Sequence, residues 1–290
     1  MSFTQKAITY TISLASGGGM TTHSGLRSSC EITDAGGVSF GHAHISIYGM
    51  TLSEMNSLTT LGTNLNVVQN NKISVQAGDS SSNMSLIFQG TIIVAWTDAQ
   101  NMPEVCFRID AMGGAFEAVM PSKVTSVQGS GDVATIAQQI AKKMNLQFEN
   151  SNVNVKLSNL YLSGSYRQQM LELAEHAGIQ WTIDKGTVAI WPTGQSRQEA
   201  AGSNIVSKDT GMVGYPAFFQ GGIIVTMLFN PSLKLGGKIQ VQSELTPANG
   251  SWTITNLVHE LDAVTPHGRW FSIVKAFNAS SMEQPPGDQA

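Results

Sequence analysis

The stretch that decides the fold lies in the last third of the chain, where short segments of one kind follow one another. They read FNPSLKLGG (229–237), IQV (239–241), GSWTI (250–254), HELD (259–262) and WF (270–271). Apolar and polar residues alternate within them, and Gly, Pro, Ser and Asn separate them, as in half-buried strands joined by tight turns. We therefore expect this part of the chain to form a β-barrel.

The first 110 residues show the same alternation. Its apolar members are Ile8, Tyr10, Ile12 and Leu14, and later Ala43, Ile45 and Ile47. Because successive side chains of a strand point to opposite faces, His42, His44, Ser46 and Tyr48 should share the face opposite the second apolar set. We also predict strands over about 72–77, 83–96 and 104–112, and a short helix over about 53–58 with Ser or Thr as its cap.

The middle of the chain changes to a helical period. Asp132 is a good N-cap for an amphipathic helix over about 132–144, and Ser165 caps a second helix that should end at Gly178. The residues after Gly178 alternate, turn at 184–186 and alternate again, which predicts a hairpin. We expect a compact α/β module here, a linker over 193–209, and a flexible tail over 279–290.

Composition limits the function. Only 12% of residues are charged, against about 25% in an ordinary soluble domain, whereas 41% are hydrophobic and 29 are glycines. A surface of uncharged polar groups loses its water at low cost, which favours extensive packing against neighbouring subunits. The formal charge of −4, without a basic block, argues against a protein that grips nucleic acid.

The two cysteines and the termini exclude further classes. Cys30 and Cys106 are too few for a disulfide framework or a cysteine-only zinc site, so we expect them to be packing residues. The N-terminus lacks the apolar core of a signal peptide, and no apolar run approaches the roughly 18 residues of a spanning helix. We expect a product made in a cytoplasm, without membrane insertion.

One glycine-rich loop resembles a dinucleotide site. Gly129, Gly131 and Ala134 form a G-x-G-x-x-A pattern before the first helix of the module, and Glu149 stands near the spacing of a ribose-binding acid. However, residues 146–150 are short and polar where a buried parallel strand is required, and Asp132 would face the phosphates. The simpler interpretation is a loop whose Asp132 caps the helix.

Other titratable groups also have ordinary explanations. His42 and His44 share a strand face, as metal ligands can, but we expect an exposed or satisfied pair because no acid stands at the next position of that face. Glu172, Glu175 and His176 read as the solvated side of a helix, since the H-E-x-x-H motif is absent. His259 and Glu260 should point to opposite faces of a strand, so that with Asp262 they form no acid/base cluster. We therefore predict no catalytic, cofactor-binding or metal residues and no cofactor.

Two blocks resemble one family. ISIYG (45–49), VQAG (75–78) and IFQGTI (87–92) resemble the first tube-like domain of baseplate hub proteins of contractile-tailed phages, including the Mu, T-even and late-control D types, and residues 229–271 resemble the second. The fold class implied is mainly β with an α+β insert, namely two tube-like β-barrel domains flanking a small helix-helix-hairpin module. The expected domains are 1–112 (first barrel), 113–195 (module), 196–278 (second barrel) and 279–290 (tail).

The resemblance implies a structural protein of the virion, not an enzyme. Such a hub is a homotrimer with pseudo-sixfold symmetry that adapts the hexameric tail tube to the trimeric central spike and leaves a channel through which DNA passes. Its partners would be the tail tube protein, the central spike protein, and wedge or tape-measure proteins. The alternatives are a nucleotide-binding enzyme using Gly129 to Ala134, a glycan-binding tail adhesion module, or a related contractile injection system.

Overall fold

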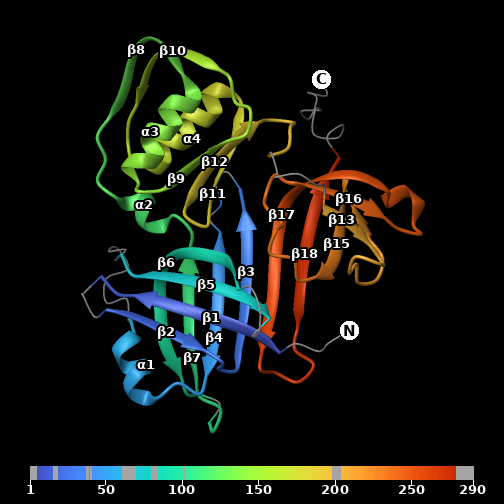
Figure 1. The fold of residues 1–290 in the computed structure, drawn as a ribbon. Coiled ribbons are helices and arrows are strands. Elements are labelled where there is room, and N and C mark those ends of the chain that lie inside the picture. Colours follow the sequence, from blue (N-terminus) through green and yellow to red (C-terminus); the bar gives the residue numbers. More distant parts are fainter. Residues whose placement is uncertain are drawn as a thin grey trace, which may run out of the picture.

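The computed structural model describes residues 5–15, 19–36, 39, 41–60, 70–79, 84–100, 102–197 and 204–278, so the tail expected over 279–290 lies outside the described residues. Figure 1 shows a mainly β molecule in which an α/β module stands at one end of a large antiparallel sheet. The mainly β class with an α/β insert is therefore confirmed.

The N-terminal region consists of strands and one short helix. Its elements are β1 (Lys6–Ser13), β2 (Met20–Ser24), β3 (Ser28–Ala35), β4 (His42–Tyr48), α1 (Leu52–Leu58), β5 (Lys72–Asp79), β6 (Ser85–Asp98) and β7 (Cys106–Met112). The strands predicted from alternation are present. The helix begins one residue earlier than expected because Thr51 caps it, in a capping box with Glu54.

The middle region has the predicted helices and hairpin, with additional short elements. These elements are α2 (Ala115–Val119), β8 (Thr125–Asp132), α3 (Val133–Lys143), β9 (Gln147–Asn150), β10 (Lys156–Leu162), α4 (Tyr166–Ala177), β11 (Ile179–Asp184) and β12 (Thr187–Pro192). Asp132 accepts a hydrogen bond from the Thr135 N–H at 2.9 Å, and Gly178 ends α4 with φ of 64°. Both caps act as predicted.

The C-terminal region returns to strands. It contains β13 (Asn204–Ser207), β14 (Ala217–Phe219), β15 (Gly222–Leu228), β16 (Lys238–Gln242), a 3-10 turn (Thr246–Ala248), β17 (Gly250–Ala263) and β18 (Trp270–Phe277). All pairings among them are antiparallel except that of β13 with β16, which is parallel.

The expectation of two closed barrels is corrected by the strand pairing. In the described part of the chain, the strands of both β regions form one thirteen-stranded sheet whose main path runs from β14 to β2 without closing. The junction is β17, whose first residues pair with β16 and whose second half pairs with β3, from Asn256 opposite Ala35 to Ala263 opposite Ser28. β17 has fourteen residues, which is long enough to pair with strands of both regions. Its backbone N–H and C=O groups therefore find hydrogen-bond partners in each region.

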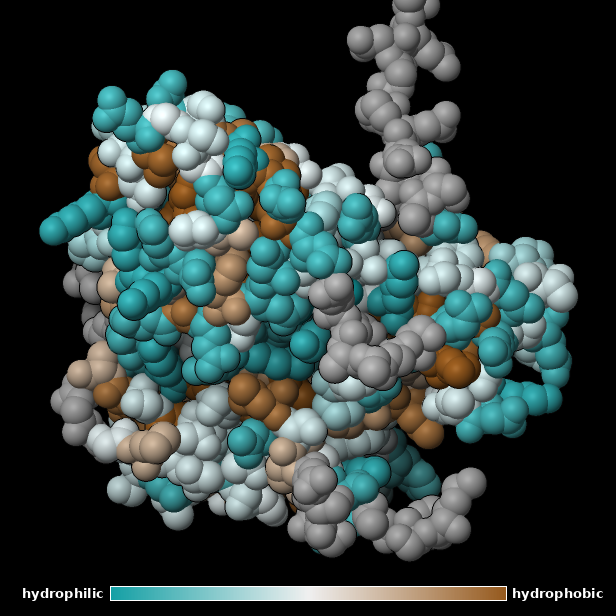
Figure 2. All heavy atoms as spheres, turned by 45° about the horizontal axis from the view of Figure 1, so that its top comes forward, coloured by the Kyte–Doolittle hydropathy of each residue, from teal (hydrophilic) through white to brown (hydrophobic). Residues whose placement is uncertain are grey.

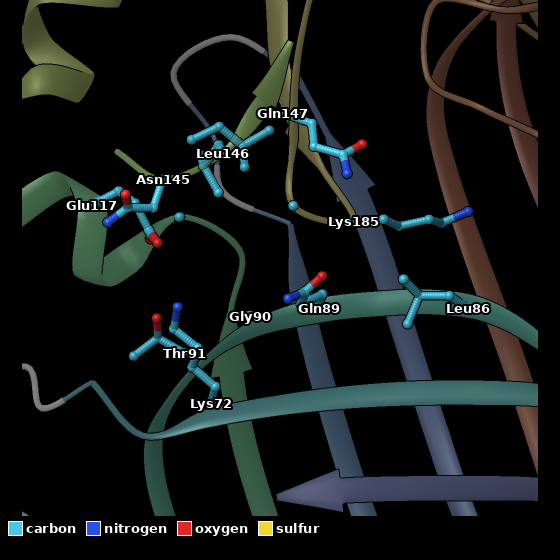
Figure 3. A pocket seen from close by; sticks show the side chains of 13 residues that line it. Lys72, Leu86, Gln89, Gly90, Thr91, Glu117, Asn145, Leu146, Gln147 and Lys185 are labelled. Carbon is cyan, nitrogen blue, oxygen red and sulfur yellow. The ribbon is translucent and has the colours of Figure 1, made fainter. Parts of the chain in front are cut away.

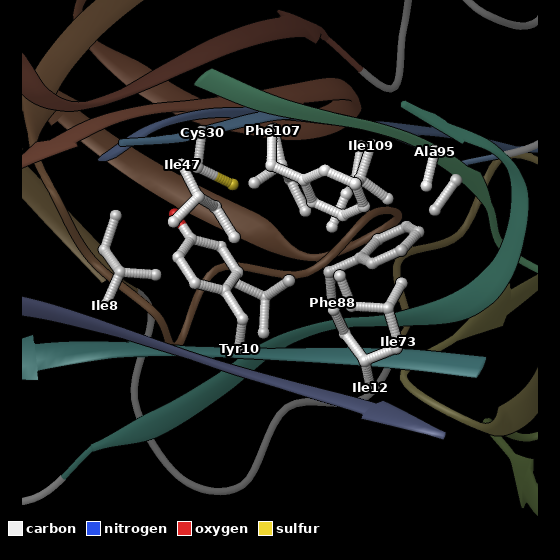
Figure 4. Close-up of a cluster of buried hydrophobic side chains, with 14 of the residues drawn as sticks. Ile8, Tyr10, Ile12, Cys30, Ile47, Ile73, Phe88, Ala95, Phe107 and Ile109 are labelled. Carbon is white, nitrogen blue, oxygen red and sulfur yellow. The ribbon is translucent and has the colours of Figure 1, made fainter. Parts of the chain in front are cut away.

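Three main hydrophobic clusters support this architecture. The first lies within the N-terminal strands, with Tyr10, Ile12, Ile73 and Phe107 almost fully buried (Figure 4). The second fills the module around α3 and α4, and the third lies between β13, β15, β16, β17 and β18. The C-terminal strand β17 contributes Leu261 and Ala263 to the first cluster, so the N-terminal core is completed by residues from the far end of the chain.

The segment predicted as a linker contains a buried ion-pair centre. Arg197 is 2% exposed and donates to both carboxylate oxygens of Glu149, at 2.6 and 2.9 Å, and to Asp184 at 3.1 Å. Its backbone N–H donates to the Gly236 carbonyl at 2.8 Å, and Lys234 lies 3.8 Å from Glu149. The segment therefore fastens the module to the C-terminal region, and residues 204–207 form β13 instead of linker.

Asp34 of β3 faces this centre from the N-terminal region. Burial, and then the nearby Asp184 carboxylate, raise the pKa of Asp34 to about 7, while Lys185 and Arg197 act in the opposite direction. Charged groups from all three regions thus meet at one place, which we call the seam and define by Asp34, Glu149, Asp184, Arg197 and Lys234.

Replacement of Arg197 by Met should destabilise the protein strongly. The change leaves Glu149 and Asp184 partly buried without their cation, and breaking such a pair typically costs about 3–5 kcal/mol. Urea unfolding followed by circular dichroism measures the loss. Lys142→Met, on the exposed side of α3, is the matched control and should leave the free energy of unfolding nearly unchanged; equal effects of the two changes would contradict the assigned role.

Replacement of Asp34 by Asn should remove the loss of stability that Asp34 causes as pH rises. Because its pKa is raised, the folded chain holds this proton more tightly than the unfolded chain, so the contribution to stability is lost as pH rises from the ordinary value of 3.8 through about 7. We expect Asp34→Asn to gain stability relative to the wild type at about pH 8 and much less at about pH 5. Urea unfolding across this pH range measures how the free energy of unfolding changes with pH, with Asp209→Asn as the control. A pH dependence equal to that of the wild type would contradict the role assigned to Asp34.

Candidate assembly interface

The outer face of the central strands is polar and contains groups from both β regions. We define the polar sheet face by Ser29, Glu31, His42, His44, Ser46, Arg108, Asp110, Glu260 and Asp262, which alternate with the buried residues of β3, β4, β7 and β17. These side chains are exposed or half-buried in the chain. Since carboxylates outnumber guanidinium groups on it, the face is mildly acidic.

One row across this face places like charges together. Asp110, His44, Glu31 and Glu260 stand opposite one another on four successive strands. His44 Nδ1 lies 2.7 Å from Asp110 Oδ1, but Glu31 and Glu260 are direct cross-strand neighbours, an arrangement that destabilises a sheet. Arg269 Nη1 lies 3.3 Å from Glu260 and offsets part of this repulsion.

The histidine pair lies on one strand face, as predicted. The rings of His42 and His44 are 6.4 Å apart and nearly parallel, and the His44 side chain is 62% exposed. Its partner Asp110 was missed because it comes from the neighbouring strand and not from the next position of the same strand. Among the described residues, no group of three His, Cys, Asp or Glu side chains gathers closely enough to hold a metal ion.

The ends of the sheet expose strand edges. Within the described chain β2 pairs only with β1, and β14 pairs only with β15. Exposed apolar side chains accompany them: Met20 on β2, and Val213, Tyr215, Phe218 and Leu228 around β14. Such edges offer unpaired backbone groups to another strand. Elsewhere hydrophilic residues cover most of the face shown in Figure 2, with hydrophobic atoms in separate groups.

The Gly129 to Ala134 loop does not have the geometry of a dinucleotide site. β8, which contains the glycines, pairs antiparallel with β10, whereas β9, which follows the helix, belongs to the sheet of β11 and β12. The required parallel β-α-β unit is therefore not formed by these elements. The Asp132 carboxylate occupies the helix N-terminus, and the Gly129 N–H donates to Asn159 Oδ1 at 2.9 Å.

The remaining candidate residues lie as the sequence predicts. His259 is buried on the inner face, 2.9 Å from Ser272 Oγ, whereas Glu260 and Asp262 lie on the outer face. Burial, and next the charge of Lys185, lower the pKa of His259 to about 3, so it is a neutral core residue. Glu175 and His176 are exposed on α4, and Glu172 is half-buried there.

Both thiols are buried and free. Burial is the main cause that raises the pKa of Cys30 and that of Cys106, which makes them packing residues instead of nucleophiles. No helix in the described ranges combines the length and the apolar content needed to cross a membrane.

Solved structures share this fold at low sequence identity. The tail protein of prophage MuSo2 from Shewanella oneidensis is similar with a TM-score of 0.62 and 12% identity, over 94% of this chain and 97% of that chain. A tail protein from Neisseria meningitidis is similar with a TM-score of 0.63 and 8% identity, over 96% of this chain and 98% of that chain. A third similar structure is an Escherichia coli component of the type VI secretion system, which itself resembles the T4 tail proteins gp27 and gp5. Its TM-score is 0.55 and its identity 11%, over 90% of this chain and 76% of that chain.

The family comparison is more specific than the shared fold. Among curated proteins no match was found. The profile of the family named Baseplate hub gp41 matches residues 7–273, which is most of the chain and includes both β regions and the module. The resemblance to baseplate hubs stated from residues 45–92 and 229–271 is thereby confirmed. The chain belongs to the baseplate hub gp41 family and is a structural component of a phage-type tail baseplate.

Proposed function

We propose that three copies of the chain close into a ring with pseudo-sixfold symmetry, which adapts a hexameric tail tube to a trimeric central spike. The observation that carries this proposal is the single sheet that joins two β regions and whose end strands, β2 and β14, each pair with only one strand among the described residues. Contacts between unlike edges of successive copies generate a ring when the rotation closes. Three chains with two β regions each would present six β units to the tube.

Each of the three regions would have its own role in the ring. We assign residues 1–112 and 196–278 as the two tube-like units, 113–195 as the module between them, and 279–290 as a tail available to partners. The tail tube protein and the spike protein are the principal partners, with wedge or tape-measure proteins as further neighbours. The low charge content favours the large buried contacts that such a ring needs.

The channel would be lined by the polar sheet face. This face spans both β regions, which is required of a continuous inner wall, and its carboxylates repel the phosphates of passing DNA. The like-charge pair of Glu31 and Glu260 reduces the stability of the sheet, so its presence fits a functional requirement better than a structural one. The chain would therefore conduct DNA without binding it, act without catalysis, and reside in the virion.

Charge on an edge strand should prevent ring formation. Phe218 is 54% exposed on β14, and an aspartate there would have to be desolvated in the edge contact. We expect the wild-type chain to have three times its single-chain mass in native mass spectrometry, and Phe218→Asp to be monomeric. Tyr161→Asp, on the exposed side of β10, is the control and should stay trimeric. A wild type that remains monomeric at high concentration would refute the ring.

Reversal of the acidic pair should make the channel retain DNA. Glu31→Lys combined with Glu260→Lys puts two cations per chain on the polar sheet face, and phosphate contacts of this kind give salt-dependent affinity. Fluorescence anisotropy with a labelled duplex should show binding that weakens as salt increases, whereas the wild type should not bind. The control is Glu172→Lys with Glu175→Lys on α4, which adds the same charge outside the channel. Equal DNA binding by both double variants would contradict the assignment of the face.

A further inference from the structure

A cavity of about 430 Å³ lies between the N-terminal strands and the module, apart from the polar sheet face and the strand edges (Figure 3). One wall is formed by β5 and β6, and the other by α2, the turn that precedes β9, and the turn between β11 and β12. Its polar lining includes Lys72, Gln89, Glu117, Asn145 and Gln147. The volume is in the range of pockets that hold small ligands or single side chains.

Glu117 is an unusual member of this lining. The residue is 6% exposed, and none of the described residues gives its carboxylate a hydrogen bond or an ion pair. It is placed there by α2, which begins after Gly114 in a left-handed conformation with φ of 75°. The Glu117 carboxylate oxygens are not among the buried side-chain atoms that lack a hydrogen-bond partner, so they border the open space of the cavity, where an entering group can reach them.

The nearby ammonium groups do not satisfy this carboxylate. Lys72 lies on the opposite wall and is exposed, so water solvates it, and it forms no ion pair with Glu117. Lys185 points away from Glu117 in Figure 3. A divalent ion is not favoured either, because no second and third acidic, His or Cys ligand stands beside Glu117 within the described chain. The open space in front of the carboxylate is suited to an organic cation.

We propose that this pocket receives a basic side chain, lysine or arginine, from a segment of a partner protein. The cation would pair with the Glu117 carboxylate, and its remaining N–H groups would donate to the side-chain amide oxygen of Asn145, which lies beside Glu117 in Figure 3. Charge-assisted hydrogen bonds of this kind are among the strongest in proteins. The apolar neighbours Leu146 and Ile183 would contact the aliphatic part of the side chain. This site is independent of ring closure.

Isothermal titration calorimetry of the full chain tests the proposal with three blocked tripeptides, acetyl-Gly-Arg-Gly-amide, acetyl-Gly-Lys-Gly-amide and acetyl-Gly-Gln-Gly-amide. At least one of the two basic peptides should bind saturably, and the glutamine peptide should not. Glu117→Gln should weaken binding about tenfold or more, since a hydrogen bond to a charged group is lost. The same variant should fold about as stably as the wild type, because the described chain gives Glu117 no hydrogen bond or ion pair that the change would remove. Glu175→Gln on α4 is the matched control and should bind normally.

The variant Lys72→Met distinguishes a purely cationic ligand from one that also accepts a hydrogen bond from Lys72. If the ligand is a cation, removal of the facing ammonium group reduces repulsion, and affinity should stay equal or rise. A loss of affinity as large as that of Glu117→Gln would mean that the ligand also uses Lys72 as a donor, and would overturn the proposal. Absence of saturable binding by both basic peptides at millimolar concentration, or equal binding by Glu117→Gln, would overturn it as well.

Discussion

The ion pairs of the buried Arg197 guanidinium are the interaction on which the position of the module against the C-terminal region depends. Arg197 pairs with carboxylates from two different strands of the module, and its own backbone is held by the loop that leads to β16. A guanidinium with 2% exposure has lost nearly all its water, so both carboxylates are needed to compensate. Because five donors in a planar fork can bind two acids at once, a lysine at this position could not make the same connection.

Two buried groups, Asp34 of the seam and His259 of β17, make the stability of the chain sensitive to protonation in opposite directions. Asp34 has a raised pKa, so its contribution to stability declines as pH rises between 3.8 and about 7. His259 has a lowered pKa, so its contribution is lost as pH falls from 6.5 through about 3. Where the two pH ranges overlap, the two groups therefore change the free energy of unfolding in opposite directions. Lys185 acts on both groups, and it lowers the pKa of each because a nearby cation disfavours protonation.

Local features of this chain are predictable from the sequence, whereas the contacts between distant segments are not. The caps at Asp132 and Ser165 and the C-cap at Gly178 each depend on neighbouring residues, and strand alternation depends on a period of two. The pairing of β17 with β3 joins residues more than two hundred positions apart, and no residue type marks it. Three further features could not be predicted from the sequence because each results from tertiary packing. They are the pairing of Arg197 with Glu149, the Asp110 partner of His44, and the burial of Glu117.

The pairing of β17 with β3 changes what two β regions in one chain can do. Two closed barrels joined by a flexible linker could tilt relative to each other, and a ring built from them would have no fixed sixfold spacing. Eight cross-strand residue pairs between β17 and β3, with Leu261 and Ala263 in the N-terminal core, make the two regions one continuous sheet instead. Backbone hydrogen bonds along such a junction resist bending far more than a linker does. The spacing of the β units in the proposed ring is therefore a property of a single chain, and assembly has only to set the angle between chains.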